Sequence, residues 1–305
     1  MITSRVDPAH FASVARWLHR DLPASEFAAL IEQRHGLSAA CPQPPMYQVT
    51  ISGTPVVAAY FNHLPGSVAT LGGVRANAGQ EPVATELIRQ LMGESRTAGI
   101  EQIQAVMNSE DKATQQLVAA AGMRPLTVVQ HQWADLATIR AHLRADTTLK
   151  VGKLCWQPAT EFARCRMAKL IVQTFIGTLD CPQLNGLRSE TQVLDGFLGG
   201  RALREQNYWE ILRIDGLIAG CVLLSRASAN VAELVYMALL PEYRGQRMGN
   251  LLIQRGLELS QRLQAEFMAL AVDENNWPAL RLYANSGFRP HCRLAVCWLP
   301  PANSW

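Results

Sequence analysis

Charged residues are scarce in this chain: they make up 17% of its 305 residues, and the formal net charge is only +3. Disordered segments need far more charge, so the composition predicts a largely folded chain. A charge so close to neutral gives no support for nucleic acid or a membrane as a partner. The hydrophobic content of 49% is ample for two cores, and the length suits two domains of about 150 residues each.

The sequence also lacks the patterns of disulfide-rich and metal-binding proteins. Its seven cysteines are odd in number and form no C-x-x-C pair, which favours free thiols in a reducing compartment. Its histidines show no H-x-x-x-H spacing, so we expect no metal. No apolar run reaches transmembrane length, and the opening MITSRVDPAH lacks the apolar region of a signal peptide. We therefore expect a soluble, cytoplasmic protein.

An internal repeat is present at a nearly fixed offset. The segments AAAGMRP and ANSGFRP contain Gly122 and Gly287, which lie 165 positions apart (287 − 122). The same offset aligns Trp133 with Trp298, and an upstream hairpin-like segment aligns at 163. One offset that spans a turn, a helix and a strand indicates two copies of one fold rather than chance similarity.

We expect these copies to span residues 1–137 and 149–305, joined by a polar linker at 138–148. Strands alternate with helices in the second copy, which predicts an α/β (α+β) fold in which a mixed, mostly antiparallel sheet is flanked by helices. The expected elements of the second copy are a strand at 149–156, a helix starting at Pro158, a hairpin turning at Asp215-Gly216, and a helix capped by Asn276 that ends before Gly287.

The segment ELVYMALLPEYRGQRMGN reads as a strand, a glycine-containing turn and the start of a helix. Consecutive backbone N–H groups from Arg244 to Gly249, with the positive end of the following helix, would form an anion nest suited to a pyrophosphate. Such a nest needs no metal ion. The alternative is a solvated surface turn.

This turn and the later segment AVDENNWPALRLYANSGF resemble the GNAT superfamily of acyl-CoA-dependent N-acyltransferases over residues 149–298. The family's later signature is complete at Asn276, Leu282-Tyr283 and Gly287-Phe288. Its phosphate motif is altered, because Arg247 replaces the middle glycine, although the guanidinium could add a contact to a CoA phosphate. The resemblance implies acetyl-CoA or another acyl-CoA as donor, held by Met237, Ala238, Leu239, Arg244, Gly245, Gln246, Arg247, Met248, Gly249, Asn250 and Asn276.

Three further side chains take roles by the same resemblance. Tyr283 matches the tyrosine that protonates the leaving thiolate, and its alternative is a half-buried core tyrosine. Glu233 is placed as a general base, with an exposed strand glutamate as the alternative. Asp180 lies in the expected acceptor-binding loop and could hold an ammonium group, unless it is merely solvated. Trp277 is expected to be a packing residue rather than an adenine platform.

The first copy departs from this pattern. At the offset of 165, Pro82 stands where the second copy has Arg247, and proline removes a nest donor. We therefore expect a degenerate first copy and one acyltransferase site in the second, which uses a small-molecule or peptide amine as acceptor. The rival hypothesis is a non-catalytic acyl-CoA sensor or scaffold. Two copies in one chain suit a monomer with an internal pseudo-dimer or a homodimer.

Overall fold

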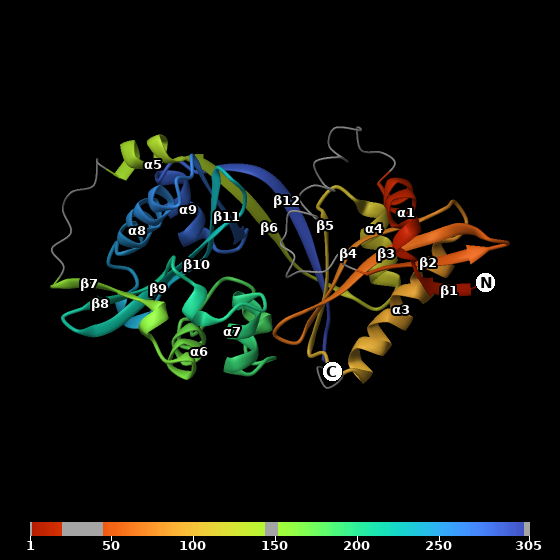
Figure 1. Cartoon of the computed structure of the whole chain (residues 1–305), viewed down its shortest axis with the longest axis horizontal. Coiled ribbons are helices and arrows are strands. Elements are labelled where there is room, and N and C mark those ends of the chain that lie inside the picture. Colours follow the sequence, from red (N-terminus) through yellow and green to blue (C-terminus); the bar gives the residue numbers. More distant parts are fainter. Residues whose placement is uncertain (1, 20–44, 144–151, 302–305) are drawn as a thin grey trace. The chain divides into compact units, whose positions relative to one another are not determined.

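The computed structural model describes residues 2–19, 45–143 and 152–301. They form two compact units: Met1–Leu126 with Ala295–Trp305, and Thr127–Leu294. Each unit combines helices with a mixed, mostly antiparallel sheet (Figure 1), which confirms the expected fold class. The six described cysteines are free thiols, and Cys41 lies outside the described residues.

Unit 1 has the strand order β1-β2-β3-β4-β5, with the end of β12 beside β5. Only β4 and β5 are paired in parallel among the printed strand pairs of this unit, and the helices α3 and α4 pack on its main core. Its elements are β1 (Ile2–Arg5), α1 (Phe11–Leu18), β2 (Met46–Ile51), β3 (Thr54–Leu64), β4 (Val68–Ala76), α3 (Glu81–Thr97), β5 (Gln102–Asn108) and α4 (Lys112–Ala120).

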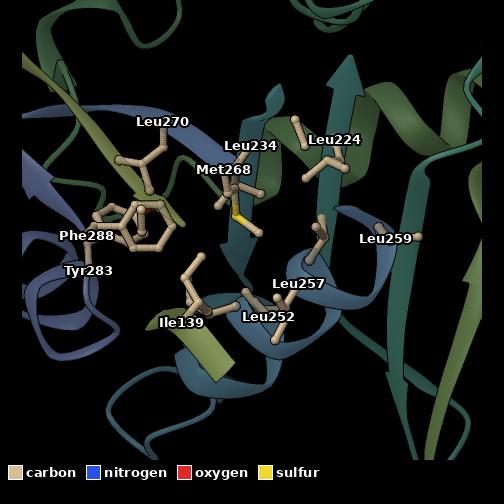
Figure 2. Close-up of a cluster of buried hydrophobic side chains, with 14 of the residues drawn as sticks. Ile139, Leu224, Leu234, Leu252, Leu257, Leu259, Met268, Leu270, Tyr283 and Phe288 are labelled. Atoms are coloured by element: carbon tan, nitrogen blue, oxygen red, sulfur yellow. The ribbon is translucent and has the colours of Figure 1, made fainter. Parts of the chain in front are cut away.

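Unit 2 has the order β12-β6-β11-β10-β9-β8-β7. One core joins the sheet to α5, α8 and α9 (Figure 2), and a second core lies between the sheet and α6 and α7. The elements are β6 (Arg124–Asp135), α5 (Leu136–Leu143), β7 (Leu154–Pro158), α6 (Arg164–Gln173), α7 (Glu190–Leu198), β8 (Trp209–Ile214), β9 (Leu217–Arg226), β10 (Val231–Leu239), α8 (Gly249–Arg262), β11 (Phe267–Asp273), α9 (Trp277–Asn285) and β12 (Arg289–Leu299).

The repeat seen in the sequence is present in the structure. Strand β5 and strand β11 begin and end 165 positions apart, and so do the helices α4 and α9. The glycines that follow these helices share a positive φ, +104° at Gly122 and +91° at Gly287. Both copies therefore end their last helix in the same left-handed turn.

The compact units do not follow the repeat boundaries. Strand β6 comes from the first repeat, yet from Thr127 onward it belongs to unit 2, where it pairs antiparallel with β11 along Phe267–Asp273. Strand β12 comes from the second repeat, and from Ala295 onward it belongs to unit 1. Each unit thus contains part of the last strand of the other repeat. Single-sequence patterns do not reveal such an exchange, because either pairing satisfies the same local alternation of apolar residues.

Two stretches differ from the sequence-based expectation. Residues 138–143 were expected within a linker, but they belong to helix α5, because Ile139 is fully buried in the core of unit 2. The helix expected from Pro158 begins only at Arg164, since Phe162 takes an extended conformation that buries its ring against α6 and α7. The expected strand appears as Leu154–Pro158, while 144–151 lie outside the described residues.

Two local turns match the sequence signals. Asp215 and Gly216 have φ of +48° and +83°, the positive pair that a two-residue hairpin between β8 and β9 requires. The side chain of Asn276 caps α9 by accepting the N–H of Ala279. Among the described residues, no helix is long and apolar enough to span a membrane.

Candidate active site

The candidate site begins where β10 and β11 part. The two strands pair in parallel only along Val231–Leu234 and Phe267–Leu270, although both continue further. Strand β10 is also bulged between Leu234 and Tyr236 in its pairing with β9. Beyond the bulge, the edge of β10 that faced β11 has no strand partner among the described residues, so backbone groups on that edge can bind a ligand.

A cleft of about 800 Å³ opens at this point within unit 2. Its walls come from the end of β10, the following turn, the first turn of α8, one face of α9 and the α6–α7 loop. The lining residues are Thr174, Gly177, Thr178, Leu179, Asp180, Tyr236, Met237, Ala238, Leu239, Arg244, Gly245, Arg247, Met248, Gly249, Asn250, Leu252, Asn276, Trp277, Pro278, Ala279, Arg281, Leu282 and Asn285.

The turn before α8 has the backbone geometry of an anion nest. Gly245 and Arg247 have positive φ values of +74° and +59°, and Met248 returns to the right-handed region with φ of −69°. In the described part of the chain, no backbone acceptor is bound by the N–H groups of residues 245–249. Alternating handedness turns successive N–H groups toward one point, which is what a phosphate group requires.

Arg247 occupies the left-handed position that a glycine would take without strain. A left-handed conformation costs a non-glycine residue about 1–2 kcal/mol. Arginine in place of glycine therefore destabilises the turn, but the turn keeps its nest geometry. The left-handed φ is part of the alternation that aims the N–H groups.

The role of Arg244 differs from the expectation for a nest donor. Its own N–H donates to the carbonyl of Pro241 at 3.2 Å, so the unpaired donors begin at Gly245. Its guanidinium donates to the carbonyls of Leu239 at 3.0 Å, Ile176 at 2.6 Å and Thr174 at 2.7 Å. Arg244 therefore fastens the α6–α7 loop to the turn.

Most residues expected at a cofactor line the cleft, and the exception is Gln246. Its side chain lies away from the cleft and donates to the carbonyl of Glu242 at 2.9 Å, which leaves only its N–H for a ligand. A Cβ at Gly249 would lie 2.7 Å from Cδ2 of Leu282, so a larger residue there would require the Leu282 side chain to move.

Tyr283 does not line the cleft. It is 7% exposed and packs edge-on against Phe288, with ring centroids 5.7 Å apart (Figure 2). Burial raises the pKa of its hydroxyl, and the charge of Asp180 raises it further. The buried Tyr283 hydroxyl is therefore protonated, and it is close enough to the cleft residue Asp180 to be affected by its charge.

Tyr236 is a cleft tyrosine that the sequence argument missed. The hydroxyl of Thr174 donates to the carbonyl of Ile171 at 2.5 Å, so the Tyr236 hydroxyl is the donor in its 2.7 Å contact with Thr174 Oγ1. Burial raises the pKa of Tyr236. Its position directly before Met237, on the strand expected to bind the acyl-CoA, was the available signal.

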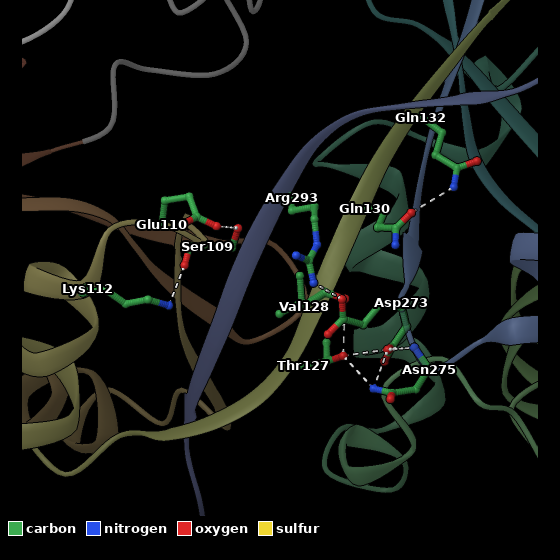
Figure 3. A network of polar contacts seen from close by, with 11 residues as sticks. Ser109, Glu110, Lys112, Thr127, Val128, Gln130, Gln132, Asp273, Asn275 and Arg293 are labelled. Carbon is green, nitrogen blue, oxygen red and sulfur yellow. Dashed lines mark hydrogen bonds and ion pairs between the residues drawn. The ribbon is translucent and has the colours of Figure 1, made fainter.

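Asp180 lies in the cleft beside Cys181 and Asp273, and one ligand atom from each of the three lies within 4.8 Å of the others. The sequence spacing gave no sign of this cluster. Its hydrogen bonds explain it without a metal: the Cys181 N–H donates to Asp273 Oδ2 at 3.0 Å, and the Asp273 N–H donates to Asp180 Oδ1 at 3.2 Å. Thr127 and Asn275 donate to the other Asp273 oxygen (Figure 3).

The neighbouring thiol is not activated. Burial, followed by the charges of Asp180 and Asp273, raises the pKa of Cys181. A raised pKa keeps the sulfur protonated and unreactive.

Glu233 lies outside the set of cleft-lining residues, on β10 three positions before Tyr236. Its side chain is exposed, yet desolvation raises the pKa of its carboxyl, offset in part by a hydrogen bond with Ser225. Asp180 shows the same combination of exposure and a pKa raised by desolvation. A carboxyl on a concave surface is reached by solvent from one side only, which explains how each of these two residues is exposed and still has a pKa raised by desolvation.

The corresponding cleft of unit 1 has no comparable turn. It measures about 1010 Å³ and is lined by residues that include Arg75, Glu81, Pro82 and Asp111. Helix α3 begins at Glu81, three positions earlier than α8 does at the offset of 165. The helix start, with Pro82 in its first turn, takes the place of the nest.

Residues 179–288 match the family model described as Acetyltransferase (GNAT) family. A curated Bacillus subtilis (strain 168) protein, named as a candidate ribosomal protein bS18 alanine N-acetyltransferase, is 37% identical over 59 residues. That match covers 19% of this chain and 39% of the length of the curated relative.

Solved structures resemble the whole chain in fold. A GCN5-related N-acetyltransferase from Sphaerobacter thermophilus aligns with a TM-score of 0.63 at 14% identity, covering 98% of this chain and 96% of that one. A tandem GNAT protein from the clavulanic acid biosynthesis pathway aligns with a TM-score of 0.54 at 17% identity, covering 99% of both. At these identities the likeness shows the fold alone.

Proposed function

We propose that the second repeat, residues 149–305, transfers an acetyl or other acyl group from acyl-CoA to an amine, in keeping with the match of residues 179–288 to the GNAT acetyltransferase family model. The observation that carries this proposal is the run of unpaired N–H groups at residues 245–249, which opens into the cleft beside the unpaired edge of β10. The two features suit the two ends of one elongated, phosphate-bearing thioester.

The phosphate end fits the turn. Five N–H groups of alternating backbone handedness and the N-terminus of the 14-residue helix α8 favour a pyrophosphate at Gly245 to Gly249. The guanidinium of Arg247 is exposed and carries no ion pair within the described chain, so it can add a charged contact. No metal ion is required by this arrangement.

The thioester end fits the parted strand. Met237, Ala238 and Leu239 pair with β9 on one side, and the opposite edge of β10 has no strand partner beyond Leu234 in the described chain. The carbonyl of Leu239 already accepts from Arg244, so the other N–H and C=O groups on that edge can bind the pantetheine arm as a further strand would. A backbone N–H aimed at the thioester carbonyl stabilises the negative charge that develops on that oxygen. The acyl-CoA supplies the activated carbonyl, and the chain positions it.

Three side chains bind the acceptor amine and transfer the protons of the reaction: Asp180, Glu233 and Tyr283. Asp180 holds the acceptor as an ammonium ion in the cleft, and Glu233 accepts the proton that makes the amine nucleophilic, directly or through water. A raised pKa makes Glu233 a stronger base than an ordinary glutamate. The amine nitrogen bonds to the carbonyl carbon, the C–S bond breaks, and Tyr283 protonates the departing thiolate.

A non-catalytic acyl-CoA sensor or scaffold remains the second candidate. The observation that favours it is that neither proposed catalytic side chain lines the cleft. Tyr283 lies in the core, and Glu233 lies three positions before the first cleft-lining residue of β10. A sensor would bind acyl-CoA and release no thiol.

Thiol release from acetyl-CoA separates the two candidates. The amine panel contains a diamine, an aminoglycoside, a lysine peptide and a peptide with an N-terminal alanine, the last because the curated relative is named for alanine acetylation. Amine-dependent release of CoA thiol above the rate without protein supports the transferase. Tight binding of acetyl-CoA without release for every amine supports the sensor.

A further inference from the structure

Trp277 is exposed at the edge of the cleft, contrary to the packing role expected from the sequence. It is 67% exposed, and within the described chain it makes no ring contact with another aromatic side chain. It is the first residue of α9 and lines the cleft. An exposed aromatic ring that lines a cleft can stack on a flat ring of a bound ligand.

The same face of α9 continues with Arg281 and Asn285. Residues four apart on a helix lie one above the other, so Trp277, Arg281 and Asn285 form one row, and all three line the cleft. Arg281 is exposed and has no acidic partner in the described part of the chain. A guanidinium without a partner, beside a flat aromatic surface, can bind both parts of a nucleotide phosphate.

The same cleft is lined by the anion nest with Arg247, which is also exposed and without an ion pair among the described residues. The acidic group nearest in sequence, Glu242, is not among the residues that line the cleft. Asp180 lies on the α6–α7 loop, which supplies the wall at the acceptor side. The nest, Arg247 and Arg281 therefore give this part of the cleft a positive potential.

We propose that Trp277 stacks on the adenine ring of CoA and that Arg281 binds the 3′-phosphate of its ribose. This inference rests on the proposed function, and it adds the recognition of the nucleotide end. The ligand class is an adenosine 3′-phosphate joined to a pyrophosphate. The nest takes the pyrophosphate, Arg281 takes the monophosphate, and the indole covers one face of the base.

Three ligands that differ by one group each test this assignment by calorimetry. They are CoA, dephospho-CoA, which lacks the 3′-phosphate, and 4′-phosphopantetheine, which lacks the nucleotide. The variants are Trp277→Ala and Arg281→Gln. The controls are Trp133→Ala, which removes another part-exposed indole from β6, and Arg289→Gln, which removes an exposed arginine that does not line the cleft.

Trp277→Ala should weaken CoA and dephospho-CoA by about 10–100-fold, the usual worth of base stacking, and leave 4′-phosphopantetheine unchanged. Arg281→Gln should weaken CoA by about 10-fold or more and leave dephospho-CoA unchanged. Equal weakening of all three ligands by Trp277→Ala, or no weakening of CoA by either variant, would overturn the inference. If the unaltered protein bound none of the three, the proposed function itself would fail, and this assignment with it.

Discussion

The guanidinium of Arg244 holds the carbonyl of Thr174 at 2.7 Å, and this contact ties the loop after α6 to the turn before α8. Two further hydrogen bonds, to Ile176 and Leu239, complete the tie. One side chain therefore fixes the distance between the α6–α7 loop and the proposed phosphate turn. The same loop carries Asp180 into the cleft.

We expect Arg244→Lys to loosen this loop while preserving the charge. A lysine is a single point donor and does not reproduce the planar fork, so at least two of the three carbonyls lose their partner. Hydrogen exchange should accelerate at residues 174–181, and the free energy of unfolding should fall by about 1–3 kcal/mol. Arg201→Lys, at an exposed site, is the control. Unchanged exchange in the loop would show that Arg244 does not hold it.

A second prediction separates two possible roles of Gly249: its backbone N–H as a donor to phosphate, and its lack of a side chain beside Leu282. Gly249→Ala and Gly249→Pro both place a Cβ near Leu282, but only proline removes the N–H. Proline is tolerated sterically by the backbone at the first position of a helix. CoA affinity should therefore fall further in Gly249→Pro than in Gly249→Ala, by about 10-fold. Equal affinities in calorimetry would remove this N–H from the phosphate site.

The two tyrosines give opposite expectations for the thiolate donor. Tyr283→Phe keeps the packing on Phe288 and should lower kcat by about 10²–10⁴-fold with little change in acetyl-CoA affinity. Tyr236→Phe should mainly disturb Thr174 and the loop, and so raise KM for the acceptor. Steady-state kinetics with chemistry shown to be rate-limiting measure both. A large loss of kcat in Tyr236→Phe and none in Tyr283→Phe would assign the donor to Tyr236.

Glu210 anchors an ion-pair network between β8 and α8, and it is almost fully buried. It binds Arg255 at 2.5 and 2.9 Å and Arg262 at 3.2 Å. Glu210→Gln should cost about 3–5 kcal/mol in urea unfolding, because it removes the buried carboxylate that binds both Arg255 and Arg262. The control is Glu258→Gln, whose carboxylate also pairs with Arg255 but is 41% exposed, and which should cost less than about 1 kcal/mol. Equal costs would mean that burial does not govern this network.

The fifth prediction concerns acid stability. Burial alone would raise the pKa of Asp273, but hydrogen bonds from Thr127, Asn275 and Cys181 outweigh it, so the pKa is lowered. A lowered folded-state pKa contributes stability that is fully present above the unfolded pKa of about 3.9 and is lost as the pH falls through the folded value.

The difference in unfolding free energy between the unaltered protein and Asp273→Asn measures this contribution. Urea titrations from pH 6 to pH 3 should give a constant difference above about pH 5 and a shrinking one below about pH 4. A difference that stays constant to pH 3 would contradict the lowered pKa.

Local chemistry was sufficient to determine the elements around the site. The positive φ at Asp215 and Gly216, the cap at Asn276 and the left-handed Gly287 each follow from two to four neighbouring residues. The repeat was also visible, because equal elements keep equal spacing along the chain. The sequence by itself therefore predicted the turn, the strand before it and the helices on either side of β11.

The tertiary structure decided everything that depends on distant partners. Only the folded structure shows that Arg244 donates hydrogen bonds to the carbonyls of Thr174 and Ile176. It also shows that Asp180 accepts the N–H of Asp273. Tyr283 is buried in the core, whereas Trp277 is exposed to water. The exchange of β6 and β12 between the units is of the same kind. Hydrogen-bond geometry and apolar periodicity act over a few residues, whereas these contacts depend on which surfaces meet, and one sequence without its fold does not specify that.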